Sequence, residues 1–269
     1  YKKMIKLKKS TKDFIKYGYV VSKIENTNNY SRIEKEVFFI IKKYLNIKKK
    51  INKNSLFNNL HKYLDIRKLN ELRLKIYREL NSKDWFREAY FTLASKTIES
   101  IVGNELAIQN NINISVQMPK DTSSKLEMHA DSLSGESKFQ AVLWVPLVNV
   151  YKTKSMYIFN KKFSQKTIKN LKNYKYKGMS TIYSNNKNKK KFIALKKGQF
   201  LLFSPNLLHG NVKNMTSETR ISMNTRFKNL FSTYGEKSQI GKRIGYFYIP
   251  FKVKPITKFA LEFDIPNEF

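Results

Sequence analysis

The chain has 269 residues, 41% of them apolar and 14% aromatic, which is enough to bury a sizeable core in one large domain. It contains no cysteine, which excludes disulfides, thiolate nucleophiles and cysteine-ligated metal sites, so any metal must be held by histidine and carboxylate groups. The longest apolar run is 141–148, far shorter than the roughly eighteen residues of a membrane helix. We therefore expect a cytoplasmic protein without a membrane span.

The formal net charge of +33 by itself indicates a nucleic acid or an anionic membrane as partner. Lysine greatly outnumbers arginine, however, and abundant Lys, Asn and Ile are typical of an AT-rich genome whatever the function. Residues 137–217 contain no Asp or Glu, and lysine is densest at 186–191. This distribution favours a solvated Lys-rich segment, with an anionic substrate or an acidic partner as the alternative.

The first hundred residues have mostly helical patterns. Residues 13–21 predict a short helix that passes through Gly18 into a first strand. Ser82 is predicted to cap a later helix that ends at Gly103, since glycine can adopt the left-handed conformation of a helix exit. Apolar residues recur at helical spacing in the ranges 34–46, 60–64, 69–80 and 85–101.

After Gly103 the pattern changes to short strands separated by polar turns. Strands are predicted at 112–118, 139–148, 155–159, 198–204 and 220–227. Helices followed by closely spaced strands indicate an α+β fold, with helices packed on one sheet of a barrel or sandwich. We expect one domain, with a helical part at 1–104, a strand core at 105–230, a Lys-rich insertion or mobile flap at 161–197 and a C-terminal extension at 231–269.

Two of the three histidines stand where they could bind a metal, whereas His61 does not. His129 and Asp131 are separated by one residue, so on a strand their side chains would point to the same face and reach one ion. His209 follows the apolar run 200–208, where a strand could return beside the first. Two imidazoles and one carboxylate on one face leave open positions at a divalent iron, although an isolated His-x-Asp pattern also arises by chance.

Arg220 and Ser222 follow His209 and lie on one face of a predicted strand. A guanidinium and a hydroxyl in this arrangement could hold one carboxylate, and a dicarboxylate co-substrate would fit the pair. The competing interpretation is a surface ion pair between Arg220 and Glu218 or another acid.

These residues together resemble the Fe(II)/2-oxoglutarate-dependent dioxygenases of the phytanoyl-CoA dioxygenase-like group. The resemblance rests on the entry segment 13–21, the His129-Ala-Asp131 pair, the LLHGN segment around His209, and the TRIS segment with Arg220 and Ser222. It spans nearly the whole chain. Segments 117–131, 142–159 and 208–228 look most like the oxygenases of bacterial surface-carbohydrate gene clusters, and the unusual YKTKSMYIFN sequence at 151–160 argues against acyl-CoA substrates.

The resemblance implies a double-stranded β-helix (jelly-roll, cupin-like) core with the N-terminal helices packed on one sheet. It also implies that His129, Asp131 and His209 bind Fe(II), and that Arg220 and Ser222 hold the far carboxylate of 2-oxoglutarate. Dioxygen would be the second co-substrate. The reaction would be hydroxylation of a small polar molecule, such as a sugar or a sugar conjugate in surface-polysaccharide or natural-product biosynthesis.

Several further side chains are candidates for the substrate pocket. Arg226 would lie on the same strand face as Arg220, so an anionic group on the substrate could pair with it, and a salt bridge to a core acid is the competing account. The remaining candidates, each of which could instead fill the core, are Gln117, Trp144, Tyr157 and Asn224.

Two other classes of protein remain as alternatives. A basic nucleic-acid-binding protein should carry alternating basic and exposed aromatic residues on one face, whereas here lysine is scattered evenly. A metal-binding barrel that does not use 2-oxoglutarate, such as an isomerase or a sugar-binding module, would make Arg220 and Ser222 dispensable.

Overall fold

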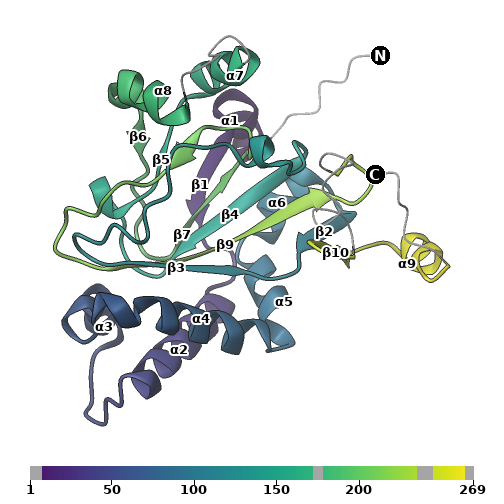
Figure 1. Cartoon of the computed structure of the whole chain (residues 1–269). Helices are drawn as coiled ribbons and strands as arrows, with labels where there is room; N and C mark the ends of the chain where they lie inside the picture. The colour runs from purple at the N-terminus through teal and green to yellow at the C-terminus, as the bar shows by residue number, and fades with distance from the viewer. Residues whose placement is uncertain (1–7, 172–177, 235–244, 264–269) are drawn as a thin grey trace, which may run out of the picture.

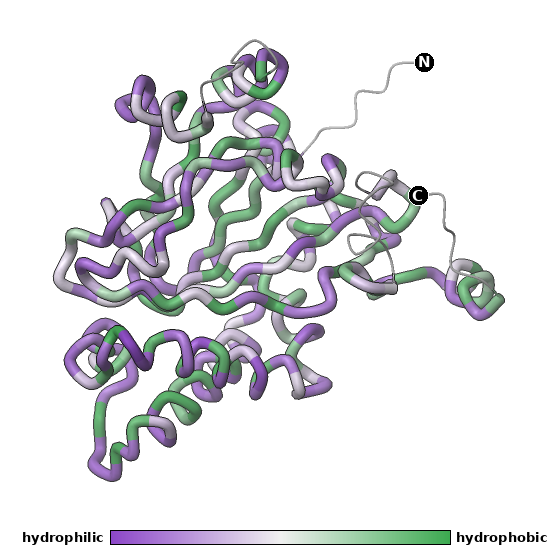
Figure 2. The backbone as a smooth tube through the Cα atoms, viewed as in Figure 1, coloured by the Kyte–Doolittle hydropathy of each residue, from purple (hydrophilic) through white to green (hydrophobic). Residues whose placement is uncertain are grey.

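The computed structural model describes residues 8–171, 178–234 and 245–263. A large antiparallel sheet lies at the centre, helices from the first hundred residues cover one of its faces, and a smaller sheet lies beyond the other (Figure 1). Apolar residues gather along the central strands of the large sheet (Figure 2). None of the described helices is long and apolar enough to cross a membrane.

The N-terminal part is helical, as its apolar spacing predicts. Its helices are α1 Lys9–Tyr17, α2 Thr27–Tyr44, α3 Lys53–Asn58, α4 Leu69–Asn81, α5 Trp85–Thr92 and α6 Ser95–Val102. The predicted helix at 60–64 is only a short 3-10 turn, Leu60–Lys62. The apolar sides of the N-terminal helices pack in the main core together with residues of the large sheet.

The single helix predicted over 85–101 is wrong, because the chain breaks after Thr92 into α5 and α6. The Glu25 carboxylate accepts hydrogen bonds from the backbone N–H groups of Lys96 (2.7 Å) and Thr97 (3.1 Å) and thereby caps a new helix start. Ser82 does not cap α5 either. Its hydroxyl donates to the Glu79 carbonyl at 3.1 Å, so it belongs to the end of α4.

The large sheet has the strand order β1-β7-β4-β9-β2-β10, and β3 pairs with β9. Its predicted members are β1 Tyr19–Lys23, β3 Asn113–Gln117, β4 Gln140–Pro146, β7 Gln199–Phe203 and β9 Arg220–Asn229. Two further members, β2 Leu106–Gln109 and β10 Tyr248–Lys252, were not predicted. Because β10 pairs with β2, the C-terminal extension supplies an edge strand of this sheet.

The small sheet has the order β6-β5-β8, with β5 at Tyr157–Ile158, β6 at Lys191–Phe192 and β8 at His209–Gly210. The Lys-rich insertion adds α7 Lys161–Lys169 and α8 Met179–Asn186, while its residues 172–177 lie outside the described chain. Apolar residues of both helices pack against Tyr157 and Phe159 in a second core cluster. The described part of the insertion therefore packs its apolar residues onto the small sheet.

Candidate metal centre

His129 and His209 lie side by side on two paired segments of backbone. The N–H of His129 donates to the carbonyl of His209 at 3.0 Å, and the N–H of His209 donates back at 2.8 Å. The sequence predicted Asp131 on a strand, but the residue begins a 3-10 turn, Asp131–Ser134. The turn brings its carboxylate to the imidazoles, so that one donor atom from each of the three residues lies within 4.8 Å of the others.

Both imidazoles present Nε2 to the centre because backbone carbonyls hold their other nitrogens. His129 Nδ1 lies 2.8 Å from the Glu127 carbonyl and His209 Nδ1 lies 2.9 Å from that of Leu207. The Nε2 atoms are 3.3 and 3.6 Å from Asp131 Oδ1. A carbonyl partner fixes the Nδ1–H tautomer and leaves the Nε2 lone pair free for a metal.

Burial and mutual charge set the protonation of these three groups. Burial lowers the pKa of His209 to about 4, which keeps this imidazole neutral. Burial alone would raise the pKa of Asp131, but the hydrogen bond with His129 and the charges of His209 and Arg226 outweigh it and hold that pKa well below its usual range. Burial would lower the pKa of His129, yet its hydrogen bonds with Asp131 and the Glu127 carbonyl raise it overall. An ionised carboxylate beside basic nitrogens is the donor set of a divalent cation.

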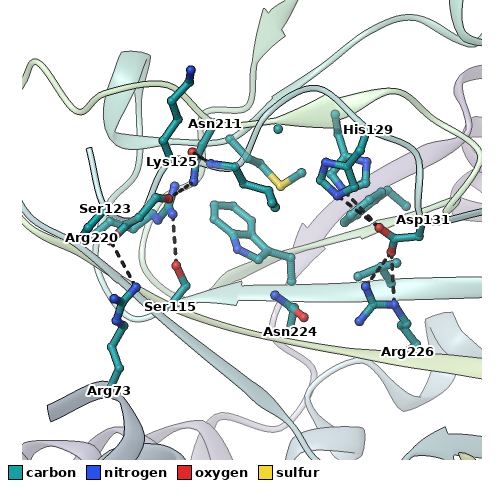
Figure 3. A pocket seen from close by; sticks show the side chains of 18 residues that line it. Arg73, Ser115, Ser123, Lys125, His129, Asp131, Asn211, Arg220, Asn224 and Arg226 are labelled. Atoms are coloured by element: carbon teal, nitrogen blue, oxygen red, sulfur yellow. Dashed lines mark hydrogen bonds and ion pairs between the residues drawn. The ribbon is translucent and has the colours of Figure 1, made fainter. Parts of the chain in front are cut away.

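Arg226 holds the far oxygen of the same carboxylate. Its Nε and Nη2 donate to Asp131 Oδ2 at 3.1 and 2.8 Å, and its Nη1 donates to Gln109 at 2.9 Å. Its Nε also lies 2.6 Å from Glu136 Oε2. This is the salt bridge to core acids that competed with a substrate role, and it leaves Asp131 Oδ1 directed at the two imidazoles (Figure 3).

Arg220 lies at the opposite end of the same cavity (Figure 3). Its side chain is 3% exposed; Nη2 donates to Ser115 Oγ at 3.2 Å, whereas Nε and Nη1 have no partner among the described residues. The buried hydroxyl of Ser222 also lacks a partner in the described chain. The alternative ion pair with Glu218 does not form, since Glu218 accepts from Lys154 at 2.8 Å. Burial lowers the pKa of Arg220 to about 10, so it remains a cation at neutral pH.

The cavity between these two ends has a volume of about 320 Å³. Three of the five predicted substrate residues line it, namely Trp144, Asn224 and Arg226. Gln117 does not line it and donates to the Val212 carbonyl at 2.7 Å. Tyr157 packs with Phe159, Tyr183 and Phe192 in the second core cluster, so it fills the core and does not line this cavity.

Some lining residues were not identified from the sequence. Arg73 reaches the Arg220 end from α4, and its Nη1 donates to Ser124 Oγ at 3.3 Å. Nothing in the spacing of α4 distinguishes Arg73 from a surface arginine. Ser115 lies on the predicted strand 112–118, but its place opposite Ser222 depends on the register of β3 and β9, which the sequence does not show.

The sequence matches no protein-family model and no curated protein. Solved structures do resemble the chain. EctD from S. alaskensis, with 2-oxoglutarate and 5-hydroxyectoine, has a TM-score of 0.58 at 12% identity over 94% of this chain and 88% of its own. HygX from Streptomyces hygroscopicus, with nickel and 2-oxoglutarate bound, has a TM-score of 0.52 at 12% identity over 85% of this chain and 89% of its own.

A third structure is the nickel complex of the non-haem monooxygenase ThoJ, with a TM-score of 0.52 at 12% identity over 84% of this chain and 79% of its own. The chain has the fold of these three proteins. At such low identity the similarity establishes the architecture, and the chemistry of this chain has to be argued from its own residues.

Proposed function

We propose that the protein is an Fe(II)- and 2-oxoglutarate-dependent oxygenase that hydroxylates a small polar substrate. Its two antiparallel sheets would form the two sides of a double-stranded β-helix within a single domain. The cavity is lined by residues of both sheets, since His209 belongs to β8 of the small sheet and Arg220 to β9 of the large one.

One observation carries the proposal: the buried guanidinium of Arg220 faces the cavity opposite the metal donors, and two of its nitrogens have no hydrogen-bond partner among the described residues. Leaving two buried donors of Arg220 without acceptors costs free energy. We therefore expect a bound ligand to supply the acceptor. A carboxylate matches a guanidinium fork in both charge and geometry. A dicarboxylate that spans the cavity from Arg220 to the metal fits this requirement, and 2-oxoglutarate is such a molecule.

The donor set fits iron. Two imidazole nitrogens and one carboxylate oxygen converge within 4.8 Å, which is the number and kind of donors in a facial set of two histidines and one carboxylate. A facial arrangement of this kind leaves positions for a chelating co-substrate and for dioxygen. HygX, of the same fold, binds nickel and 2-oxoglutarate according to its structure.

When bound, Fe(II), 2-oxoglutarate and dioxygen would supply the oxidising chemistry, placing one oxygen atom in a substrate C–H bond and the other in succinate as carbon dioxide leaves. The residues of this chain would bind the co-substrate and orient the metal ligands. Arg220, Ser222 and Ser115 would hold the far carboxylate, while Arg226 keeps Asp131 Oδ2 occupied so that Oδ1 serves the metal. Trp144 and Met156 add apolar surface to the cavity lining, which would disfavour water beside the reacting atoms.

The cavity size limits the substrate. A volume of 320 Å³ is near the lower end of the roughly 300–1,000 Å³ typical of small-molecule sites, and the co-substrate takes part of it. This favours a compact molecule over an acyl-CoA. Asn224, Lys125 and the ring of Trp144 line the wall, a combination of polar groups and an aromatic face that suits a sugar or sugar conjugate.

The proposal is tested by incubating the purified protein with Fe(II), 2-oxoglutarate and dioxygen and measuring succinate. Slow succinate formation without added substrate is expected, because many such sites turn over uncoupled once the co-substrate is bound, and Asp131→Ala should abolish it. Metal binding by the wild type without any 2-oxoglutarate-dependent product would instead indicate a metal-binding barrel of another activity.

A further inference from the structure

A second cavity, separate from the metal centre, lies between α1, the start of α7 and β6. Its volume is about 550 Å³, within the range of small-molecule sites, and it shares no lining residue with the metal cavity. Among the residues that the structure describes, five lysines and no acidic residue line it. They are Lys16, Lys161, Lys162, Lys189 and Lys191.

The high overall charge of the chain does not account for this composition. The depression beside α4 is lined by Arg67 and Lys68 but also by Asp65 and Glu71, so its charges balance. In the lysine-lined cavity none of the five side chains forms an ion pair with a residue that the structure describes. Like charges gathered in one concavity repel one another, and a bound anion would relieve this repulsion.

The lysines come from three segments that the fold brings together. Lys189 and Lys191 line the cavity, whereas Lys190 between them points to the other side, with its Nζ 5.1 Å from the centre of the Tyr183 ring. Lys161 and Lys162 occupy the first turn of α7, after Asn160 caps the helix by accepting from the Phe163 N–H at 2.8 Å. The positive end of the helix dipole therefore adds to the lysine charges.

The rest of the lining is mostly aromatic and apolar. Tyr17 is 44% exposed and lies beside Tyr19, with ring centroids 6.2 Å apart. Ile158, Phe159 and Ile193 add apolar surface, and Asn160 completes the lining. A purely inorganic anion would leave these rings unused, whereas a ligand with both phosphate groups and a planar ring would use both parts of the cavity.

We propose that this cavity binds a nucleoside diphosphate or a compound built on one, with the lysines contacting the phosphates and Tyr17 stacking on the base. The site does not depend on the metal centre. Its ligand would bind whether or not the oxygenase proposal holds.

The test uses isothermal titration calorimetry of the whole chain with ADP at near-physiological salt. We expect one ADP per chain, with binding that excess 2-oxoglutarate does not displace. The double substitution Lys162→Gln/Lys191→Gln should raise the Kd by about tenfold, since it removes two partly exposed charge contacts. The matched control Lys138→Gln/Lys169→Gln removes the same charge from two exposed lysines of another depression and should leave the Kd within about twofold.

Comparing pyrophosphate with ADP separates the contribution of the lysines from that of Tyr17. Tyr17→Ala should weaken ADP binding and leave pyrophosphate binding unchanged, whereas equal loss of both would remove the stacking contact from the proposal. Absence of ADP binding, binding at many sites, or equal weakening by the two double variants would overturn it. Binding of a poly-glutamate peptide but not of ADP would also overturn it, in favour of an acidic protein partner.

Discussion

The chemistry of this chain is concentrated in a few side chains whose partners differ sharply. Asp131 is surrounded by cationic and imidazole partners, whereas Arg220, buried to a similar extent, has one hydroxyl as its hydrogen-bond partner among the described residues. The sequence predicted both as ligand-binding residues because their order and spacing match a known pattern. It could not decide the partner of Arg226, because Glu136 and Gln109 approach that guanidinium only in the folded chain.

Replacing Arg220 tests the binding of the co-substrate. Arg220→Ala should raise the Kd for 2-oxoglutarate by about a hundredfold, since it removes charge-assisted hydrogen bonds from a buried site. Fe(II) affinity should stay as in the wild type, and Arg220→Lys should recover part of the loss. Calorimetry with Ni(II) as a redox-inert metal measures the Kd for the metal and the Kd for 2-oxoglutarate. Arg32→Ala serves as the control, because the Arg32 guanidinium contacts Trp85, 3.9 Å from the ring centroid, and is not part of the proposed site. Equal loss of metal binding would mean that the role of Arg220 is misassigned.

Replacing Arg226 tests how the metal carboxylate is oriented. Arg226→Leu should lower metal affinity by about 10- to 100-fold, the effect usually seen when the partner of a ligand is removed. It should also destabilise the fold by roughly 3–5 kcal/mol, because Asp131 and Glu136 would lose a buried cation. Arg226→Lys retains the charge and should fold while still binding metal more weakly. Unchanged Ni(II) affinity in Arg226→Lys would argue against an orienting role.

Lys228 should give the stability a measurable pH dependence. Burial lowers its pKa to about 7, below the 10.5 of an exposed lysine, so between these values the unfolded chain binds a proton that the folded chain does not. The stability contributed by Lys228 should therefore rise with pH across this window, by at most about 1.4 kcal/mol per pH unit. Urea unfolding of the wild type and Lys228→Met at pH 7, 8 and 9 isolates the effect. A constant difference between the two would contradict the lowered pKa.

At the scale of elements, local patterns predicted most helices and the longer strands but not their boundaries. The apolar spacing over 85–101 continues through a real break, because the cap that starts α6 comes from Glu25, far away in the sequence. The short strands β6 and β8 have two residues each, too few for a period to be visible, and long-range pairing defines them.

The cap of α6 can be tested directly. Glu25→Ala should lower the free energy of unfolding by about 1–2 kcal/mol, as loss of a helix cap typically does. Glu36→Ala, which removes an exposed ion pair with Lys83, should cost less than about 1 kcal/mol and serves as the control. Urea denaturation followed by circular dichroism measures both. Equal effects of the two substitutions would show that the Glu25 contacts stabilise little.

At the scale of the whole molecule, an α+β class follows from helices at the front and strands behind. The strand order does not follow, because the residues that bring β10 beside β2 and β1 beside β7 are far apart in the chain. The same long-range pairing places His209 beside His129 and Arg220 across the cavity from both. Order and spacing in the sequence therefore named these residues as candidates, and the fold shows that they line one cavity.

The most direct test is anaerobic titration of the protein with Fe(II) and 2-oxoglutarate, followed by visible absorption. A weak charge-transfer band should develop only when both are present, should saturate at one equivalent of iron, and should require far more 2-oxoglutarate in Arg220→Ala. Absence of the band in wild-type protein that binds iron with unchanged stoichiometry would contradict the assignment of this centre to 2-oxoglutarate chemistry.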